Sequence, residues 1–211
     1  MEVIEHIFSE CDIGRDGVLN YDEALPCWQL VETDEYTLFS MLQGKSGIPD
    51  IYGTCGNMYA VQYANAEPYL GFQTTMSETR PWNLRAKLAI ALLDMIESLE
   101  HTPYGTLYLC DVQEANFGVV EKEDRLVAKA IDVDISWFEP AMISAVAYEK
   151  NETCSGHSDC EFVSCRVECI HSKCSGQLVS NNLMVRMELS SFIMLCLHSV
   201  KDFPLPLRIN D

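Results

Sequence analysis

Two aspartates and an asparagine, placed around two predicted strands, constrain the fold of this chain more than any other feature. Asp111 follows the apolar segment 106–110, Asn116 lies five residues further on, and Asp132 ends a second apolar segment, 125–131. Segments of this length that are rich in apolar and β-branched residues are typical of buried strands. The sequence therefore predicts that two strands deliver these three polar side chains to loops.

ATP-dependent phosphoryl transfer uses polar residues in this order. The first aspartate accepts a proton from the attacking hydroxyl, while the asparagine and the second aspartate hold magnesium on the phosphates. Upstream, apolar residues recur at helical spacing over 84–99, which predicts a buried helix ahead of the first strand. The alternative is a polar turn between two buried strands, because Asp and Asn five residues apart occur in many loops. The flanking helix and strands favour the phosphoryl-transfer arrangement.

The charge of the chain narrows the range of its partners. The 211 residues are 48% hydrophobic, which indicates a globular protein, and 32 acidic against 14 basic residues give a net charge of −18. A surface this acidic argues against nucleic acid and anionic membranes as partners, and favours divalent cations.

The cysteines point to an oxidising compartment. The chain has ten, and five of them lie close together in sequence: Cys154, Cys160, Cys165, Cys169 and Cys174. Their spacings of four to six residues suit zinc poorly. Because Ser, Gly, Asn and acidic residues fill the gaps, we expect a disulfide-stapled loop region. The odd count means that one of the five pairs with a cysteine elsewhere or stays free.

Asn151 begins an Asn-Glu-Thr glycosylation sequon, which fits a lumenal or extracellular location, although one sequon can arise by chance. The first residues carry neither the basic nor the apolar region of a signal peptide. Segment 183–200 is the nearest to a transmembrane helix, but charged residues interrupt it. We expect that an N-terminal sequence with a membrane anchor is missing here; the alternative is that the cysteines stay reduced.

Residues 12–23 match the twelve-residue calcium loop of an EF-hand. The ligand positions are filled by Asp12, Asp16, Val18 (through its carbonyl), Asn20 and Glu23. Gly14 stands at the third position, where Asp or Asn usually coordinates, and this should weaken calcium binding. Helices are expected at 2–11 and 21–31, and Cys11 and Cys27 bracket the loop. The alternative is a helix-loop-helix that binds no cation.

A further helix is predicted at 34–42, with Glu35 in its first turn, and strands are predicted at 50–53 and 58–63. One interpretation of Glu35 is that it only favours the helix dipole, since acidic residues stabilise a helix N-terminus.

Together these motifs are similar to the divergent protein kinase domain family, whose members are cysteine-rich, kinase-like proteins of the endoplasmic reticulum. The resemblance covers roughly residues 1 to 183. It rests on the calcium-type loop ahead of the Glu35 helix, on the cysteine cluster, and on segments 52–56, 109–118 and 131–140. It implies an α+β, protein-kinase-like fold with a partial N-lobe, a C-lobe, an inserted EF-hand and a cysteine-rich C-terminal segment. The expected bounds are 1–32 for the EF-hand, 33–80 for the N-lobe part, 81–150 for the C-lobe core, and 151–211 for the cysteine-rich segment with a C-terminal helix.

The resemblance also implies roles for single residues. Asp111 looks like the catalytic base, Asn116 and Asp132 like the ligands of the metal and its nucleotide, and Glu35 like the helix glutamate that pairs with an ATP-anchoring lysine. Asp134 is a rival to Asp132 for the metal. The implied cofactors are ATP with Mg²⁺ or Mn²⁺, and Ca²⁺. The implied partners are nucleotide, divalent cations and an unknown hydroxyl acceptor, with no nucleic acid, in the lumen or membrane of the endoplasmic reticulum.

Departures from the family pattern leave the activity open. The first lysine, Lys45, follows Glu35, and no glycine-rich loop precedes it. One hypothesis is an active kinase fold in the full-length form. A second is a pseudokinase that acts as a calcium-responsive, disulfide-stapled binding module. A third is a disulfide-rich structural protein in which the kinase resemblance is only ancestry.

Overall fold

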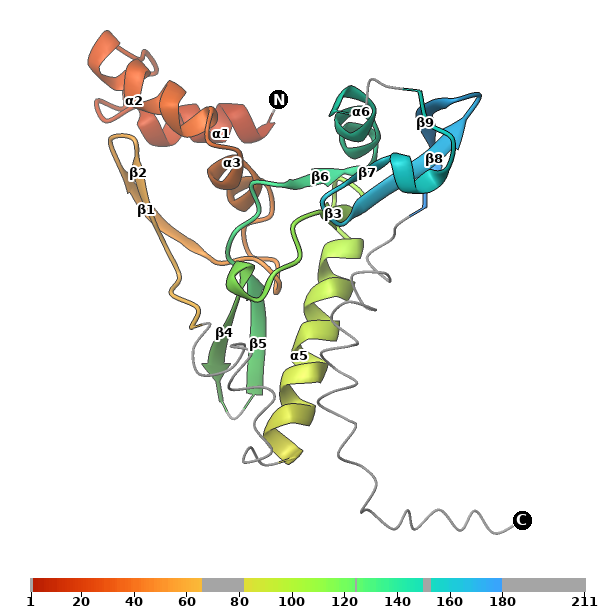
Figure 1. The fold of residues 1–211 in the computed structure, drawn as a ribbon. Coiled ribbons are helices and arrows are strands. Elements are labelled where there is room, and N and C mark those ends of the chain that lie inside the picture. The colour runs from red at the N-terminus through yellow and green to blue at the C-terminus, as the bar shows by residue number, and fades with distance from the viewer. Residues whose placement is uncertain (1, 66–81, 124, 150–152, 180–211) are drawn as a thin grey trace.

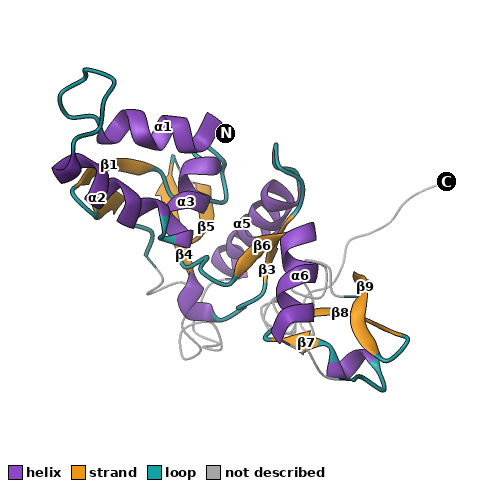
Figure 2. Ribbon diagram, turned by 90° about the horizontal axis from the view of Figure 1, so that it is seen from above, coloured by secondary structure: helices purple, strands orange, loops and turns teal. Residues whose placement is uncertain are grey.

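The computed structural model describes residues 2–65, 82–123, 125–149 and 153–179 (Figure 1). Within these ranges the chain has an α+β fold. Three N-terminal helices and a hairpin lie on one side, and a helix with a small sheet lies on the other. Seen from above, a long helix and a short strand pair lie between these two groups (Figure 2).

The N-terminal group contains α1 (Glu2–Cys11), α2 (Tyr21–Val31) and α3 (Asp34–Met41), close to the bounds expected from periodicity. A capping box starts α2: the Asn20 side chain accepts the Glu23 amide, and the Glu23 carboxylate accepts the Asn20 amide. This exchange satisfies amides that the first helical turn leaves without intrahelical partners. The three helices share a small core of Ile7, Cys27, Leu30 and Tyr36.

The hairpin of β1 (Ile51–Cys55) and β2 (Met58–Val61) follows α3 and is antiparallel. Tyr59 of β2 packs against Tyr36 of α3, with ring centroids 5.1 Å apart. Tyr59 and Ile51 also contact the larger core described below. The hairpin therefore connects the N-terminal helices to the rest of the protein.

The largest core forms around α5 (Trp82–Glu100), which contains the helix expected at 84–99. One face of α5 packs on the antiparallel hairpin of β4 (Phe117–Lys122) and β5 (Arg125–Ala130). β5 is the strand expected before Asp132, whereas β4 was not identified from the sequence. The residues of α5 that enter this core are Leu88, Ala91, Leu92, Met95, Ile96 and Leu99.

Gly118 marks the point where the chain after β2 crosses β4. Asn65 and Val119 exchange two backbone hydrogen bonds of 3.0 Å each. A Cβ atom at Gly118 would lie 2.6 Å from both the Cβ and the carbonyl oxygen of Ala64, a distance that real Cβ atoms do not tolerate. The close approach of these two backbones therefore requires glycine.

The C-terminal group begins with β3 (Leu107–Leu109), which pairs with β6 (Ser136–Phe138) and leads into α6 (Glu139–Glu149). The segment that holds the five clustered cysteines, 154–174, was expected to be a loop region, and this prediction was wrong. After η2 (His157–Asp159) it forms a three-stranded antiparallel sheet of β7 (Glu161–Phe162), β8 (Cys165–Ile170) and β9 (Lys173–Leu178). The physical reason is that Cys165 and Val167 fill alternate buried positions of β8, so that cysteine takes the place of an apolar residue in the strand pattern.

Some expectations lie outside the described residues: glycosylation at Asn151, the connector after 65, and the C-terminal helix within 183–211. Among the helices that are described, none combines the length and the apolar character needed to cross a membrane.

Replacing Gly118 by alanine tests the crossing. We expect Gly118→Ala to lower the free energy of unfolding by about 1–3 kcal/mol, because the added methyl group overlaps Ala64. Chemical denaturation monitored by fluorescence measures the change. Gly156→Ala is the matched control, since its Cβ would meet nothing closer than the Ser158 hydroxyl at 3.8 Å. Equal stabilities for the two variants would contradict the assignment.

Candidate functional site

Asp111 lies just beyond the end of β3, and Asn116 holds it in place. Asn116 ends the short helix η1 (Glu114–Asn116) and is 5% exposed. Its side-chain amide donates to the Asp111 carbonyl oxygen and to Asp111 Oδ2, both at 3.0 Å. Gln113 Nε2 donates to the same carboxylate oxygen at 2.5 Å. The orientation of the Asp111 carboxylate is therefore fixed by two amide groups.

Asp132 reaches the same region from the end of β5. The Ile131 amide donates to the backbone carbonyl of Asn116 at 2.9 Å, which joins the strand end to η1. Val133 is completely buried, whereas Asp132 and Asp134 on either side of it are exposed. The buried valine thus anchors two solvent-facing carboxylates beside the Asp111 loop.

Glu35 approaches from the N-terminal side, in the first turn of α3. The hydroxyl of Tyr59 donates a short hydrogen bond to its half-buried carboxylate. The family resemblance assigns a lysine partner to this glutamate, but no lysine precedes Glu35 in the sequence; in the structure a tyrosine from β2 holds it. Sequence analysis did not single out Tyr59, although the alternation of 58–63 predicts that Tyr59, Val61 and Tyr63 share one face.

The pKa values show that these carboxylates act on one another. Burial raises the pKa of Glu35, and the charges of Asp132 and Asp134 raise it further, against the opposing effect of the Tyr59 hydrogen bond. Burial also raises the pKa of Asp132, together with the charges of Asp134 and Asp111. Asp132 thus interacts through its charge with Glu35, Asp111 and Asp134, and we call these four residues the carboxylate cluster.

The carboxylate cluster fits a hard divalent cation. Magnesium and calcium prefer oxygen ligands, and a bound cation inverts the electrostatic balance that raises these pKa values. The Asn116 side-chain nitrogen donates to Asp111, so the side-chain oxygen Oδ1 is the atom left for a metal.

A cavity of about 280 Å³ between the β4–β5 turn and α5 is separate from the carboxylate cluster. It is lined by residues that include Ser46, Asp94, Lys122 and Arg125, and no member of the carboxylate cluster lines it.

Lys129, on β5, was also missed by the sequence analysis. It is 6% exposed, and its Nζ donates to the Ile48 carbonyl at 2.7 Å. Burial lowers the pKa of this lysine. The Ala130 amide donates to Gly47 in the same segment, at 2.9 Å. Strand β5, which leads to Asp132, is therefore joined by two hydrogen bonds to the segment that follows α3.

A disulfide fixes the residue before Asp111. Cys110 bonds to Cys165 on β8, 55 residues away in sequence, and the Ser164 amide donates to the Cys110 carbonyl at 2.7 Å. Closing a loop of this length removes about 4 kcal/mol of unfolded-state entropy in the chain-entropy model. Of the two alternatives for the odd number of clustered cysteines, a partner elsewhere or a free thiol, the structure shows the first, with Cys110 as the partner.

The other two disulfides of the cysteine cluster join its own members, in a pairing that the sequence left open. Cys154 bonds to Cys169, and Cys160 bonds to Cys174. All five clustered cysteines are therefore in disulfides, as predicted. Among the described residues Cys55 is free and exposed.

The loop between α1 and α2 is closed by its own side chains. Asp12 accepts the amides of Asp16 and Gly17 at 3.3 and 2.7 Å, and Asp16 accepts the Val18 amide at 2.9 Å. Glu23 reaches back across the loop to the Gly14 amide at 3.2 Å. A disulfide between Cys11 and Cys27 joins the flanking helices. The carboxylates expected to bind calcium are thus gathered in one short loop.

Comparison with known proteins gives one family. A family model described as the protein-kinase domain of FAM69 matches residues 27–203. The match includes Glu35, Asp111, Asn116, Asp132 and Asp134, and it begins after the loop of residues 12–23. It agrees with the resemblance to a divergent kinase-like family. No solved structure matches the chain.

The raised pKa values predict how stability depends on pH in metal-free protein. A folded-state pKa above the unfolded value means that the folded state binds more protons, so stability falls as pH rises above the unfolded-state pKa of about 4. Glu35→Gln removes one such group and keeps an acceptor for Tyr59. We expect this variant to melt higher than the wild type at neutral pH, with little difference at the acidic end, by calorimetry with a chelator. Glu97→Gln, at an exposed position of α5, should leave the profile unchanged; a wild-type-like profile for Glu35→Gln would contradict the assignment.

Proposed function

The chain belongs to the family of FAM69 protein-kinase domains, and on this premise we propose that the carboxylate cluster with Asn116 is a site for Mg²⁺ and ATP that transfers the γ-phosphoryl group to a hydroxyl. One observation carries the proposal. Asn116 binds Asp111 through its side chain and Ile131 through its backbone, so one residue holds the candidate base beside the candidate metal ligands.

Each residue has a distinct role in the proposed site. Asp111, oriented by Asn116 and Gln113 through Oδ2, accepts the proton of the attacking hydroxyl at Oδ1. Asn116 Oδ1 and the Asp132 carboxylate hold the metal, and Asp134 supplies a further oxygen. A magnesium ion held by these residues would supply positive charge that offsets the charge of the phosphates. Glu35, in the first turn of α3, adds a fourth carboxylate to the cluster.

A second candidate function is favoured by the contact at Glu35. Tyr59 holds this glutamate where an active kinase places a lysine that anchors ATP. The alternative is a pseudokinase, in which the same residues bind cations or nucleotide without phosphoryl transfer. The two functions differ in turnover, not in binding.

We also propose that residues 12–23 bind Ca²⁺ as an EF-hand. The support is the ligand set at positions one, five, nine and twelve and the closed geometry of the loop. Only Glu32 and Thr33 separate α2 from α3, and Thr37 Oγ1 donates to the Val31 carbonyl at 3.0 Å. A change in the calcium loop would therefore reach α3 and Glu35 through a short, hydrogen-bonded connection.

A location in the secretory pathway follows as part of the proposal. Four disulfides among the described residues are typical of oxidising compartments. The sequon at Asn151 is consistent with the endoplasmic reticulum.

Thermal shift and ATP turnover test the first proposal. We expect Mg·ATP to raise the melting temperature of the wild type but not of Asp132→Asn, which lacks a metal ligand. Asp111→Asn should still bind nucleotide, while turnover of ATP falls by about 10²–10⁴-fold because the base is gone. Asp94→Asn, an exposed change on α5, is the matched control. Binding without turnover in the wild type would favour the pseudokinase, and binding unaffected by Asp132→Asn would exclude the proposed site.

Calorimetric titration with calcium tests the loop. Glu23→Gln should weaken binding by at least about tenfold, because it removes the bidentate charged ligand. Gly14→Asp should strengthen it by about tenfold: a Cβ at this position lies 3.7 Å from Asp12 Oδ1, so the new carboxylate faces the existing ligands. If neither variant changes the affinity, calcium binds elsewhere or not at all. An Asp22→Asn control alters charge within the loop at a position that supplies no ligand.

A further inference from the structure

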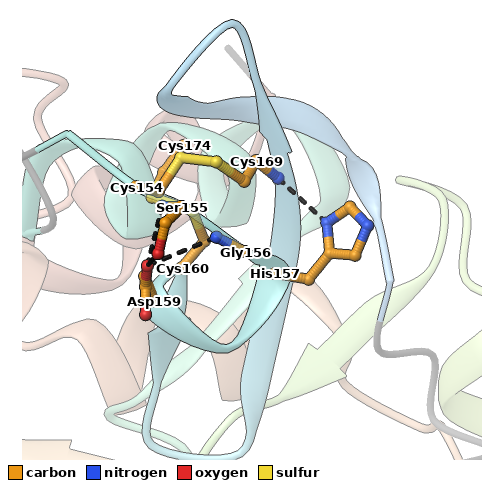
Figure 3. The surroundings of a disulfide bond; sticks show 8 residues. All are labelled: Cys154, Ser155, Gly156, His157, Asp159, Cys160, Cys169 and Cys174. Carbon is orange, nitrogen blue, oxygen red and sulfur yellow. Dashed lines mark hydrogen bonds between the residues drawn. A yellow bond between two sulfur atoms is a disulfide. The ribbon is translucent and has the colours of Figure 1, made fainter.

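Two disulfides of the C-terminal sheet lie against each other, as Figure 3 shows. The Sγ atoms of Cys154, Cys160 and Cys174 all lie within 4.8 Å of one another, and Cys169 is bonded to Cys154. Cys160 is completely buried, and Cys154 and Cys174 are each 5% exposed. Three buried sulfurs and the partly buried Cys169 bonded to one of them therefore form one group, which we call the sulfur cluster.

The backbone holds these cysteines in place independently of the S–S bonds. Cys169 and Cys174 are directly opposite each other in the β8–β9 pair. The Cys154 amide donates to the Ser172 carbonyl, and the Cys160 carbonyl accepts the Val167 amide, both at 3.1 Å. These contacts do not involve the sulfur atoms, so they favour a close placement of the four thiols when both disulfides are open.

Two further contacts brace the loop that carries Cys160. The Asp159 carboxylate accepts hydrogen bonds from the amide and the hydroxyl of Ser155, each at 2.8 Å. These bonds restrict the backbone conformation of the turn before η2. His157 Nδ1 accepts the Cys169 amide at 3.0 Å (Figure 3). That ring nitrogen is therefore committed to the sheet and is not directed at the sulfur cluster.

We propose that the sulfur cluster is a Zn²⁺ site when its two disulfides are reduced. A tetrahedral zinc site with Zn–S bonds of about 2.3 Å places neighbouring sulfurs about 3.8 Å apart. The sulfurs of Cys154, Cys160 and Cys174 already lie within 4.8 Å of one another, and opening the two disulfides would free each bonded pair to move apart to the zinc spacing by cysteine side-chain rotation. With four sulfurs and no open position, the site is structural.

The chemistry of the change balances. Two equivalents of a dithiol reductant give four electrons and four protons to the two disulfides, and each reductant is oxidised to its own disulfide. Four thiols result, and Zn²⁺ displaces their four protons to form the tetrathiolate site. The thiolates select a soft cation, whereas the carboxylate cluster and the loop of residues 12–23 offer oxygen ligands that suit magnesium and calcium. The proposed metal sites therefore do not compete.

Cobalt(II) and zinc binding to the intact chain test the proposal. After reduction with a phosphine and removal of the reductant, we expect one cobalt ion per chain, with the intense absorption of tetrahedral thiolate coordination, and displacement of cobalt by zinc. Cys160→Ser and Cys174→Ser should each lower the affinity at least about tenfold. Cys55→Ser, which removes the exposed free thiol, is the matched control and should bind normally. The oxidised protein should bind no cobalt at the cluster.

Hydrogen exchange at the amides of β8 and β9 provides a second measurement. Protection in the reduced, zinc-loaded protein should match that of the oxidised protein and exceed that of the reduced, metal-free protein. The proposal fails if the reduced protein binds no cobalt, if Cys160→Ser and Cys174→Ser bind as well as Cys55→Ser does, or if zinc binds without protecting the sheet. None of these readouts involves nucleotide, so they are independent of the proposed phosphoryl transfer.

Discussion

The geometry of the candidate site depends on one buried side chain, Asn116. Its side-chain amide donates to both the backbone carbonyl and the carboxylate of Asp111. Its backbone carbonyl accepts the amide of Ile131, the residue before Asp132. A buried amide without partners would cost about 1–3 kcal/mol, so the protein is stable only with both loops in register. Asn116 thus joins two segments of the chain into one site, whatever chemistry that site performs.

The carboxylates around Asn116 repel one another. Burial and neighbouring charges raise the pKa values of Glu35 and Asp132, which means that their ionised forms are disfavoured in the folded state. Such clustering of like charges costs stability and is more typical of functional sites than of structural ones. Two hydrogen bonds hold the segments that carry these acids in place. Lys129 on β5 donates to the Ile48 carbonyl, and Tyr59 on β2 donates to Glu35.

Sequence patterns predicted the elements with clear periodicity and missed those defined by distant contacts. The helix at 84–99 and the strand before Asp132 show in the apolar spacing, because local geometry decides which residues are buried. The strands β8 and β9 were missed, since cysteine fills the buried positions that apolar residues usually occupy. The pairing of Cys110 with Cys165 and the contact of Tyr59 with Glu35 join segments far apart in sequence, and no spacing rule encodes them.

The bond between Cys110 and Cys165 has a consequence for biosynthesis. During synthesis from the N-terminus, the Asp111 loop emerges with an unpaired thiol at its start, and the matching cysteine follows only 55 residues later. Cys55 is already exposed by then and offers a wrong partner within the same polypeptide. Maturation of the loop therefore waits for the last strands to fold, and an oxidoreductase that resolves mispaired thiols would set the rate at which the finished protein accumulates.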